Sequence, residues 1–176
     1  MLGRWQNGSS LVRNPDRPGR AVDNDFASGA EDPQGHRCPL GAHIRRSNPR
    51  DSLDEDRETQ ISIGKRHRIL RVGRTYEKKD KGGKVEKGLL FMCLNADIER
   101  QYEFIQQTWV SSNSFQGLVG EKDPTIGSHH GGNRFSIPSW EKVTVLRDMP
   151  QFVTTKGGGY FFMPSRSALR YLMSRL

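Results

Sequence analysis

The sequence predicts an α+β fold with a mainly antiparallel sheet. Apolar stretches with strand character follow one another around a polar, glycine-containing turn, and two segments show the 3.6-residue period of amphipathic helices. In chain order these segments give strand, strand, helix, strand and helix, a pattern typical of α+β domains rather than of a parallel sheet. At 176 residues, the chain has room for roughly one domain.

Residues 1–36 are predicted to form an irregular N-terminal segment, because glycine, proline, asparagine and aspartate are frequent there and no helical or strand period is visible. Residues 37–176 are then expected to form the domain. Its first strand is predicted at His67–Tyr76 and its second at Gly88–Asn95. The charged segment Glu77–Lys87, with its glycine pair, separates them as an exposed hairpin loop.

A helix is predicted from Asp97 to Ser111, with Asp97 as its N-cap. Its apolar side chains recur at steps of four, three and four residues, which places them on one helical face directed at the sheet. These positions are Ile98, Tyr102, Ile105 and Trp109.

The C-terminal third is predicted to contain a loop, a strand and a helix. Phe115–Val143 is rich in glycine, serine and histidine and is expected to be a loop. Gln151–Pro164 is expected to be a strand, or a hairpin pair that turns at the triple glycine 157–159. Ser165–Arg175 closes the chain as a short helix.

The net charge of +8, from 28 Lys and Arg against 20 Asp and Glu, allows binding to polyanions as one class of function. The basic residues are spread over the chain, however, and no nucleic-acid motif or interleaved aromatic pattern accompanies them. A solvated basic surface is therefore favoured over a nucleic-acid interface by a wide margin.

No apolar run approaches the ~18 residues that span a bilayer, and no secretory leader is readable at the N-terminus. The two cysteines, Cys38 and Cys93, are too few for a disulfide framework. These features favour a chain of the reducing cytoplasm.

The segment Cys38–Arg50 carries the most specific pattern of the chain, C-P-L-G-A-H-I-R-R-S-N-P-R. Its histidine, His43, follows an apolar turn and precedes a basic cluster. One imidazole is enough to hold a haem iron, because the porphyrin supplies four nitrogens. Residue type alone favours an ordinary histidine, and the Cys-x-x-Cys-His motif of covalent haem attachment is absent.

Three further segments give the His43 motif a context: I-L-R-V-G-R-T-Y at 69–76, G-L-L-F-M-C-L-N-A-D at 88–97 and F-V-T-T-K-G-G-G-Y-F-F-M-P at 152–164. In this order, and over most of the chain, the sequence resembles the C-terminal half of a DyP-type (dye-decolourising) haem peroxidase. The resemblance implies a ferredoxin-like module, one half of a dimeric α+β barrel type of fold. It also implies haem b (iron protoporphyrin IX) as cofactor.

The resemblance assigns roles to single residues. His43 becomes the axial ligand of the iron, and Asp123 the acceptor of its other ring N–H. Arg71 corresponds to the distal arginine, which stabilises the charge that develops as the O–O bond breaks. In the family's Arg-x-x-x-Pro-Tyr/Phe-Gly pattern, Thr75 here replaces the proline and Glu77 the glycine.

Leu89 and Phe91 match the pair that roofs the distal haem pocket, and their spacing of two places both on one face of a strand. Arg45 or Arg46 is expected to pair with the haem propionates. Without the resemblance, Leu89 and Phe91 would be plain core residues and Asp123 the start of an Asp-Pro turn.

The family's distal aspartate motif, Gly-x-x-Asp-Gly, is not found; residues 29–33 match only its beginning and end in proline. The function implied is a peroxidase that uses hydrogen peroxide to oxidise dyes, phenols or other bulky donors, in a truncated or split form. The alternatives are a non-catalytic haem-binding half that needs an N-terminal partner or a homo-oligomer, and, far behind, a basic nucleic-acid-binding domain. Trp109, Tyr160 and Trp140 are candidates for relaying electrons from the surface, and each is as well explained by packing.

Overall fold

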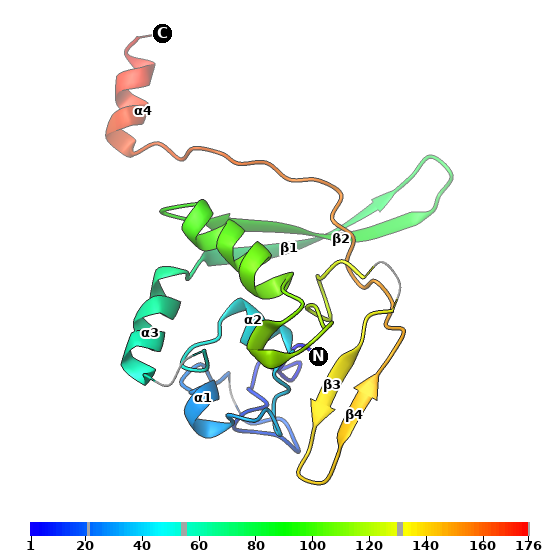
Figure 1. Cartoon of the computed structure of the whole chain (residues 1–176). Coiled ribbons are helices and arrows are strands. Elements are labelled where there is room, and N and C mark those ends of the chain that lie inside the picture. The colour runs from blue at the N-terminus through cyan, green and yellow to red at the C-terminus, as the bar shows by residue number, and fades with distance from the viewer. Residues whose placement is uncertain (21, 54–55, 130–131, 176) are drawn as a thin grey trace.

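A computed structural model describes residues 1–20, 22–53, 56–129 and 132–175. Short helices and two separate two-stranded antiparallel sheets make up the fold, so the α+β class with antiparallel pairing is confirmed. Figure 1 shows the longest pair of strands behind a helix, with the N-terminal third of the chain gathered below them.

The β1–β2 hairpin is the largest element and joins β1 (Leu70–Lys79) to β2 (Val85–Leu94). Its register runs from Leu70 opposite Leu94 to Lys79 opposite Val85. The turn is held by Asp80, whose carboxylate accepts hydrogen bonds from the N–H groups of Gly82 and Lys84. Both predicted strands are confirmed, and the loop between them is shorter than expected because strand pairing continues through its charged residues.

The helix predicted at 97–111 is present at Glu99–Val110, in front of the hairpin. It winds more widely than an α-helix, with hydrogen bonds from residue i to i−5, such as Glu103 N–H to the Ile98 carbonyl at 3.0 Å. Asp97 accepts the N–H of Arg100 at 3.0 Å, as an N-cap residue does.

Among the elements that were not predicted are two helices and one strand pair. The helices are α2 (His43–Ser47) and α3 (Arg57–Arg66), the latter capped by the Asp56 carboxylate. In α3 the buried positions are Gln60 and Gly64, so no apolar stripe marks this helix in the sequence.

The predicted loop 115–143 is wrong in part, because it contains β3 (Phe135–Pro138). This strand pairs with β4 (Val143–Leu146) in an antiparallel sheet. Phe135 is fully buried and anchors the pair.

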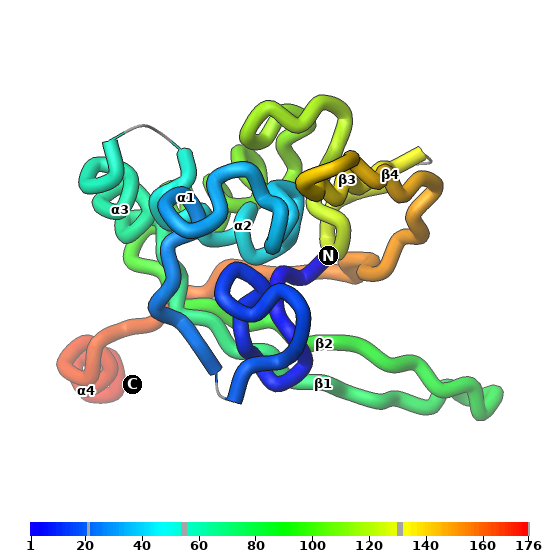
Figure 2. Tube along the Cα trace, turned by 90° about the horizontal axis from the view of Figure 1, so that it is seen from below, coloured from blue at the N-terminus to red at the C-terminus, as the bar shows by residue number. Residues whose placement is uncertain are grey.

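The strand or hairpin predicted at Gln151–Pro164 is also wrong. These residues run as an extended arm that no described strand pairs with, and they end in α4 (Arg166–Met173), which confirms the closing helix. Ser165 caps α4 by accepting the N–H of Ala168. Both views show α4 standing away from the body of the molecule (Figures 1 and 2).

The core consists of two small clusters. One is Val12, Phe26, Cys38 and Ala42. The other is formed by the wide helix and the segment after it, Ile105, Trp109, Val110 and Phe115. The described part of residues 1–36 carries little regular structure beyond α1 (Ser28–Glu31), yet two of its residues belong to the first cluster. This segment therefore packs as part of the same body as α2. Within the described residues, no helix has the length and apolar character needed to cross a membrane.

Candidate functional site

His43 begins α2, and the N-terminus of the chain fixes this helix in place. The His43 N–H donates to the Met1 carbonyl at 2.9 Å, and the Ile44 N–H donates to the Leu2 carbonyl at 3.1 Å. Ala42, just before the helix, is fully buried. The His43 side chain itself is 28% exposed, so one edge of the imidazole remains open while its backbone is held.

Asp123 orients that imidazole. His43 Nδ1 and Asp123 Oδ2 lie 2.8 Å apart, and the Asp123 side chain is completely buried. The other carboxylate oxygen, Oδ1, accepts from the N–H and hydroxyl of Thr125 and from the N–H of Ile126. The carboxylate therefore cannot turn away, and it fixes the proton of the imidazole on Nδ1.

The pKa of Asp123 reflects this environment. Burial alone would raise it, but the hydrogen bond and charge of His43, together with the Ile126 and Thr125 donors, lower it from 3.8 to about 2. Asp123 is thus ionised near neutral pH. With Nδ1 bound to a carboxylate, Nε2 on the open edge is the ring nitrogen left for a ligand.

This arrangement fits a haem iron. A ligating histidine in proteins donates its second ring N–H to a carboxylate or carbonyl, and a buried carboxylate does so here. A single open imidazole edge is also all that a porphyrin-bound iron requires. No group of three or more His, Cys, Asp or Glu side chains suited to a bare metal ion occurs among the described residues.

Arg71, Leu89 and Phe91 lie on one face of the β1–β2 hairpin. The register places Arg71 opposite Cys93, Gly73 opposite Phe91 and Thr75 opposite Leu89, and residues opposite one another in an antiparallel pair share a face. Leu89 is 59% and Phe91 42% exposed, so this apolar surface is accessible. The structure thus brings together the three residues expected to line the distal pocket.

Arg71 also lies near the N-terminal segment that holds α2. Burial lowers the pKa of Arg4; the field of Asp23 opposes this, and the positive charge of Arg71 lowers it further. Arg4 is one residue from Gly3, where an added Cβ would collide with the Ile44 side chain of α2. The first residues of the chain thus contact α2 and lie within the electrostatic range of Arg71.

Arg45 and Arg46 have a different setting from the one expected. Both are fully buried. Arg45 forms an ion pair of 2.8 Å with Asp32, and Arg46 donates to the backbone carbonyls of Trp109, Ser112 and Glu121. They attach α2 to the rest of the body, which leaves no exposed guanidinium for a haem propionate at either position.

Asp32 is the important residue that sequence reasoning did not assign. Besides Arg45, its carboxylate accepts the N–H of Cys38 at 2.8 Å, so it holds the turn that leads to His43. Asp32 and Arg45 are 13 residues apart, a spacing that belongs to no sequence motif. Only the burial of both side chains marks them as a pair, and burial cannot be read from the sequence.

The three aromatic relay candidates have unequal settings. Trp109 is buried in the second core cluster, and Trp140 is 82% exposed against His36. Tyr160 donates its hydroxyl to Glu103 at 2.7 Å, and its ring lies 6.3 Å from that of Tyr102. The Tyr102 ring in turn lies 6.3 Å from the ring of Phe91, on the face of the hairpin that carries Arg71.

Comparison with known proteins bears on this site. No protein-family model matches the chain. The multifunctional dye peroxidase DyP2 of Amycolatopsis sp. is 34% identical over 98% of this chain and 40% of its own length. The dye-decolorizing peroxidase AauDyP1 of Auricularia auricula-judae is 31% identical over 96% of this chain and 38% of its own length. The chain belongs to the DyP-type peroxidase family.

Solved structures of DyP-type peroxidases agree with this assignment. DyP2 from Amycolatopsis superposes with a TM-score of 0.68 and 32% identity, over 89% of this chain and 37% of that one. The Anabaena DyP-type peroxidase also gives a TM-score of 0.68, at 26% identity, over 86% of this chain and 34% of that one. The ferredoxin-like α+β fold expected from the sequence agrees with these neighbours. The chain spans about two fifths of the length of the curated DyP relatives that it matches.

Proposed function

We propose that this chain provides the iron-binding half of a DyP-type haem peroxidase, with His43 as the axial ligand. The observation that carries the proposal is the His43–Asp123 pair: a completely buried, ionised carboxylate 2.8 Å from Nδ1, with the opposite edge of the ring open. A purely structural histidine would not need its second nitrogen left accessible. The haem-binding domain of this proposal is residues 37–176, supported by residues 1–36.

Haem b would supply the redox centre that accepts hydrogen peroxide as oxidant and a dye, phenol or other bulky molecule as electron donor. The residues of this chain bind and orient. Asp123 holds the His43 proton on Nδ1 and increases the electron donation of Nε2. Arg71 would provide a fixed positive charge to the bound haem, and Leu89 and Phe91 would offer it an apolar surface that excludes water once covered.

Proton transfer needs an acidic group beside Arg71. On the Arg71 face of the hairpin, the one carboxylate among the described strand residues is Glu77, which lies six residues further along β1 and pairs with Lys87 at 3.2 Å. Arginine stays protonated and cannot carry a proton back and forth, so Arg71 cannot act as the acid and base. General acid–base help of that kind is worth roughly 10² to 10⁴ in rate. This observation favours a second candidate function, a haem-binding half that turns over peroxide only when an N-terminal partner supplies an acidic side chain.

The ligand assignment is tested by titrating haem into the chain and recording the Soret band. His43→Ala should abolish the shifted band, and Asp123→Asn should keep a band of altered position, because the imidazole then loses its anionic partner. His36→Ala is the matched control, since His36 packs against Trp140 away from any carboxylate partner that the structure describes. An unchanged band in His43→Ala would show that another residue binds the iron.

Peroxide turnover by the haem-loaded chain separates the two candidate functions. Turnover that falls at least a hundredfold in Arg71→Ala supports the peroxidase in its own right. Haem binding with negligible turnover, restored by adding the N-terminal half of a relative, supports the partner-dependent half.

A further inference from the structure

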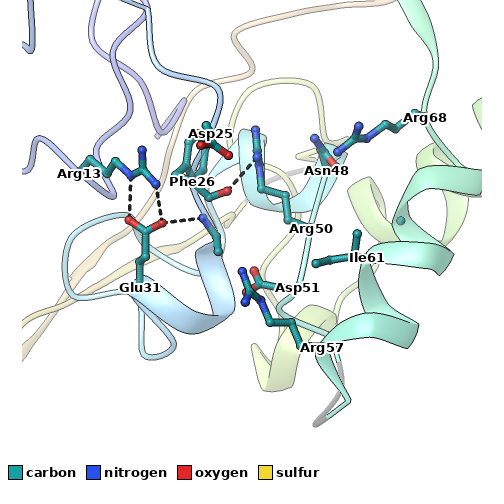
Figure 3. A pocket seen from close by; sticks show the side chains of 12 residues that line it. Arg13, Asp25, Phe26, Glu31, Asn48, Arg50, Asp51, Arg57, Ile61 and Arg68 are labelled. Atoms are coloured by element: carbon teal, nitrogen blue, oxygen red, sulfur yellow. Dashed lines mark hydrogen bonds and ion pairs between the residues drawn. The ribbon is translucent and has the colours of Figure 1, made fainter.

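A cavity of about 360 Å³ lies between the N-terminal segment, α1 and α3 (Figure 3). Arginine dominates its lining, with Arg13, Arg50, Arg57 and Arg68 contributed by four different segments. Neither the His43–Asp123 pair nor the Arg71 face takes part in this cavity.

Two of these four charges are already neutralised. Arg13 makes a bidentate pair with Glu31, at 3.0 and 3.1 Å. Arg57 lies 3.5 Å from the Asp51 carboxylate, which also accepts the N–H groups at the start of α1.

Arg50 and Arg68 make no ion pair among the described residues, and the remaining acidic group of the lining, Asp25, acts on Arg13. Burial lowers the pKa of Arg50, and the positive charge of Arg68 lowers it further. The two guanidinium groups thus repel each other. The fields of Asp51 and Asp23 oppose this effect on Arg50, but neither carboxylate forms an ion pair with it.

Arg50 is held in a strained and specific position. Its φ is +62°, in the left-handed region that residues other than glycine rarely adopt. Its carbonyl packs against Gly64 of α3, where an added Cβ would lie 3.4 Å away. Such strain persists when the surrounding structure fixes it, and it concentrates at sites that bind ligands.

The guanidinium of Arg50 presents one edge to the cavity. Its Nη1 donates to the carbonyls of Asn24 and Phe26, and the group stacks 3.9 Å from the centre of the Phe26 ring. Its Nε is buried and has no hydrogen-bond partner. Because Nη1 is anchored and Nε is covered, Nη2 is the guanidinium nitrogen left to donate into the cavity, and a carboxylate or phosphate oxygen is the acceptor that such a charged donor binds most strongly. Figure 3 shows Asn48 and Arg68 beside the Arg50 side chain.

We propose that the cavity bounded by Asn48, Arg50 and Arg68 binds a small oxyanion, a carboxylate or a phosphate. Arg50 provides the charged Nη2 donor, Arg68 the second positive charge and the Asn48 amide a further donor. The same chemistry has two sources, a free anion such as phosphate or a carboxylate carried by a larger molecule such as a haem propionate.

Titration of the full chain with inorganic phosphate at constant ionic strength tests the site, by calorimetry and by the melting temperature. We expect a saturable rise in melting temperature and about tenfold weaker binding in Arg68→Gln. Arg66→Gln is the matched control, because it removes the same charge from the exposed side of α3, outside the cavity. Arg50→Gln should abolish saturable phosphate binding. If that variant fails to fold, the comparison of Arg68→Gln with Arg66→Gln decides the result, because Arg68 is exposed.

The proposal is overturned if the wild-type chain shows no saturable binding, or if Arg66→Gln and Arg68→Gln weaken it equally. Competition with haem and with its dimethyl ester then identifies the source. Displacement of phosphate by haem but not by the ester assigns the site to propionates, and displacement by neither assigns it to a free anion. Displacement by both overturns the proposal, since the ring and not an oxyanion would then occupy the cavity. Phosphate binding does not involve His43, so failure here leaves the Soret experiment unaffected.

Discussion

At the scale of single residues, Asp123 is the group whose chemistry is most constrained. Its pKa is lowered from 3.8 to about 2, so the ionised form stabilises the folded chain. A depressed carboxyl pKa gives stability that is present above pH 4 and is lost as the pH falls from about 4 to about 2. The difference amounts to about 2 kcal/mol.

The free energy of unfolding of the haem-free chain, measured by urea titration between pH 6 and 2, should therefore fall in this range for the wild type. Asp123→Asn should remove most of that fall, because the amide does not titrate there. Asp16→Asn, at an exposed position, should retain it. Equal pH profiles for Asp123→Asn and the wild type would contradict the His43–Asp123 assignment.

Sequence reasoning identified His43, Asp123, Arg71, Leu89 and Phe91 through a family pattern, and the structure brings the first two into contact and the last three onto one face. The buried setting of Arg45 and Arg46 was not predictable, for a physical reason. The sequence shows that two positively charged side chains follow His43. It does not show that they are buried, because their partners are Asp32 and backbone carbonyls more than 60 positions away.

At the scale of elements, α1 depends on a close approach between backbones. Gly29 lies so near the Asp51 carbonyl that a Cβ there would collide with it, while the Asp51 carboxylate accepts the N–H groups of Gly29 and Ala30. Gly29→Ala should therefore lower the free energy of unfolding by roughly 1–3 kcal/mol. Denaturant titration measures this. Gly157→Ala, where no atom lies within 4 Å of the added Cβ, is the control and should have little effect.

The hairpin and the wide helix were predictable because each carries a local signal. For β1 and β2 the signal is two apolar stretches on either side of a charged turn with a glycine pair, and for the helix it is a repeat of four, three and four residues before Val110. The arm at 151–164 carries equally good strand residues, and the prediction failed because a strand also needs a neighbour, which depends on the rest of the sheet. The helix α3 forms although its sequence shows no sign of it, since its buried residues are Gln60 and Gly64 and no apolar period marks them.

At the scale of the whole molecule, much apolar surface is exposed on the β1–β2 hairpin. On the face opposite Arg71, Val72 is 47%, Leu90 56% and Met92 47% exposed. Contiguous apolar patches promote association. We expect the haem-free chain to associate with rising concentration in sedimentation velocity experiments, and the double variant Val72→Lys/Met92→Lys to reduce this. A wild-type chain that stays monomeric at all concentrations would contradict the expectation.

Haem that binds only the folded chain should also raise its stability. At a hundredfold excess over the dissociation constant, mass action contributes about 2.7 kcal/mol. Melting curves with and without haem measure this gain, and His43→Ala should lose it. A melting temperature that haem does not change in the wild type would argue against a haem site in the folded chain.

The extended arm makes one position of the chain an easy substrate for proteases. A protease needs a stretch of backbone that can enter its cleft without prior unfolding, and the described residues 152–164 donate no backbone hydrogen bond to the body. Lys156 lies in this stretch, so brief trypsin treatment should cut after Lys156 before it cuts at Lys81, in the bonded hairpin turn. Mass spectrometry of the digest would then show a core of residues 1–156 that has lost α4 and retains the His43–Asp123 pair.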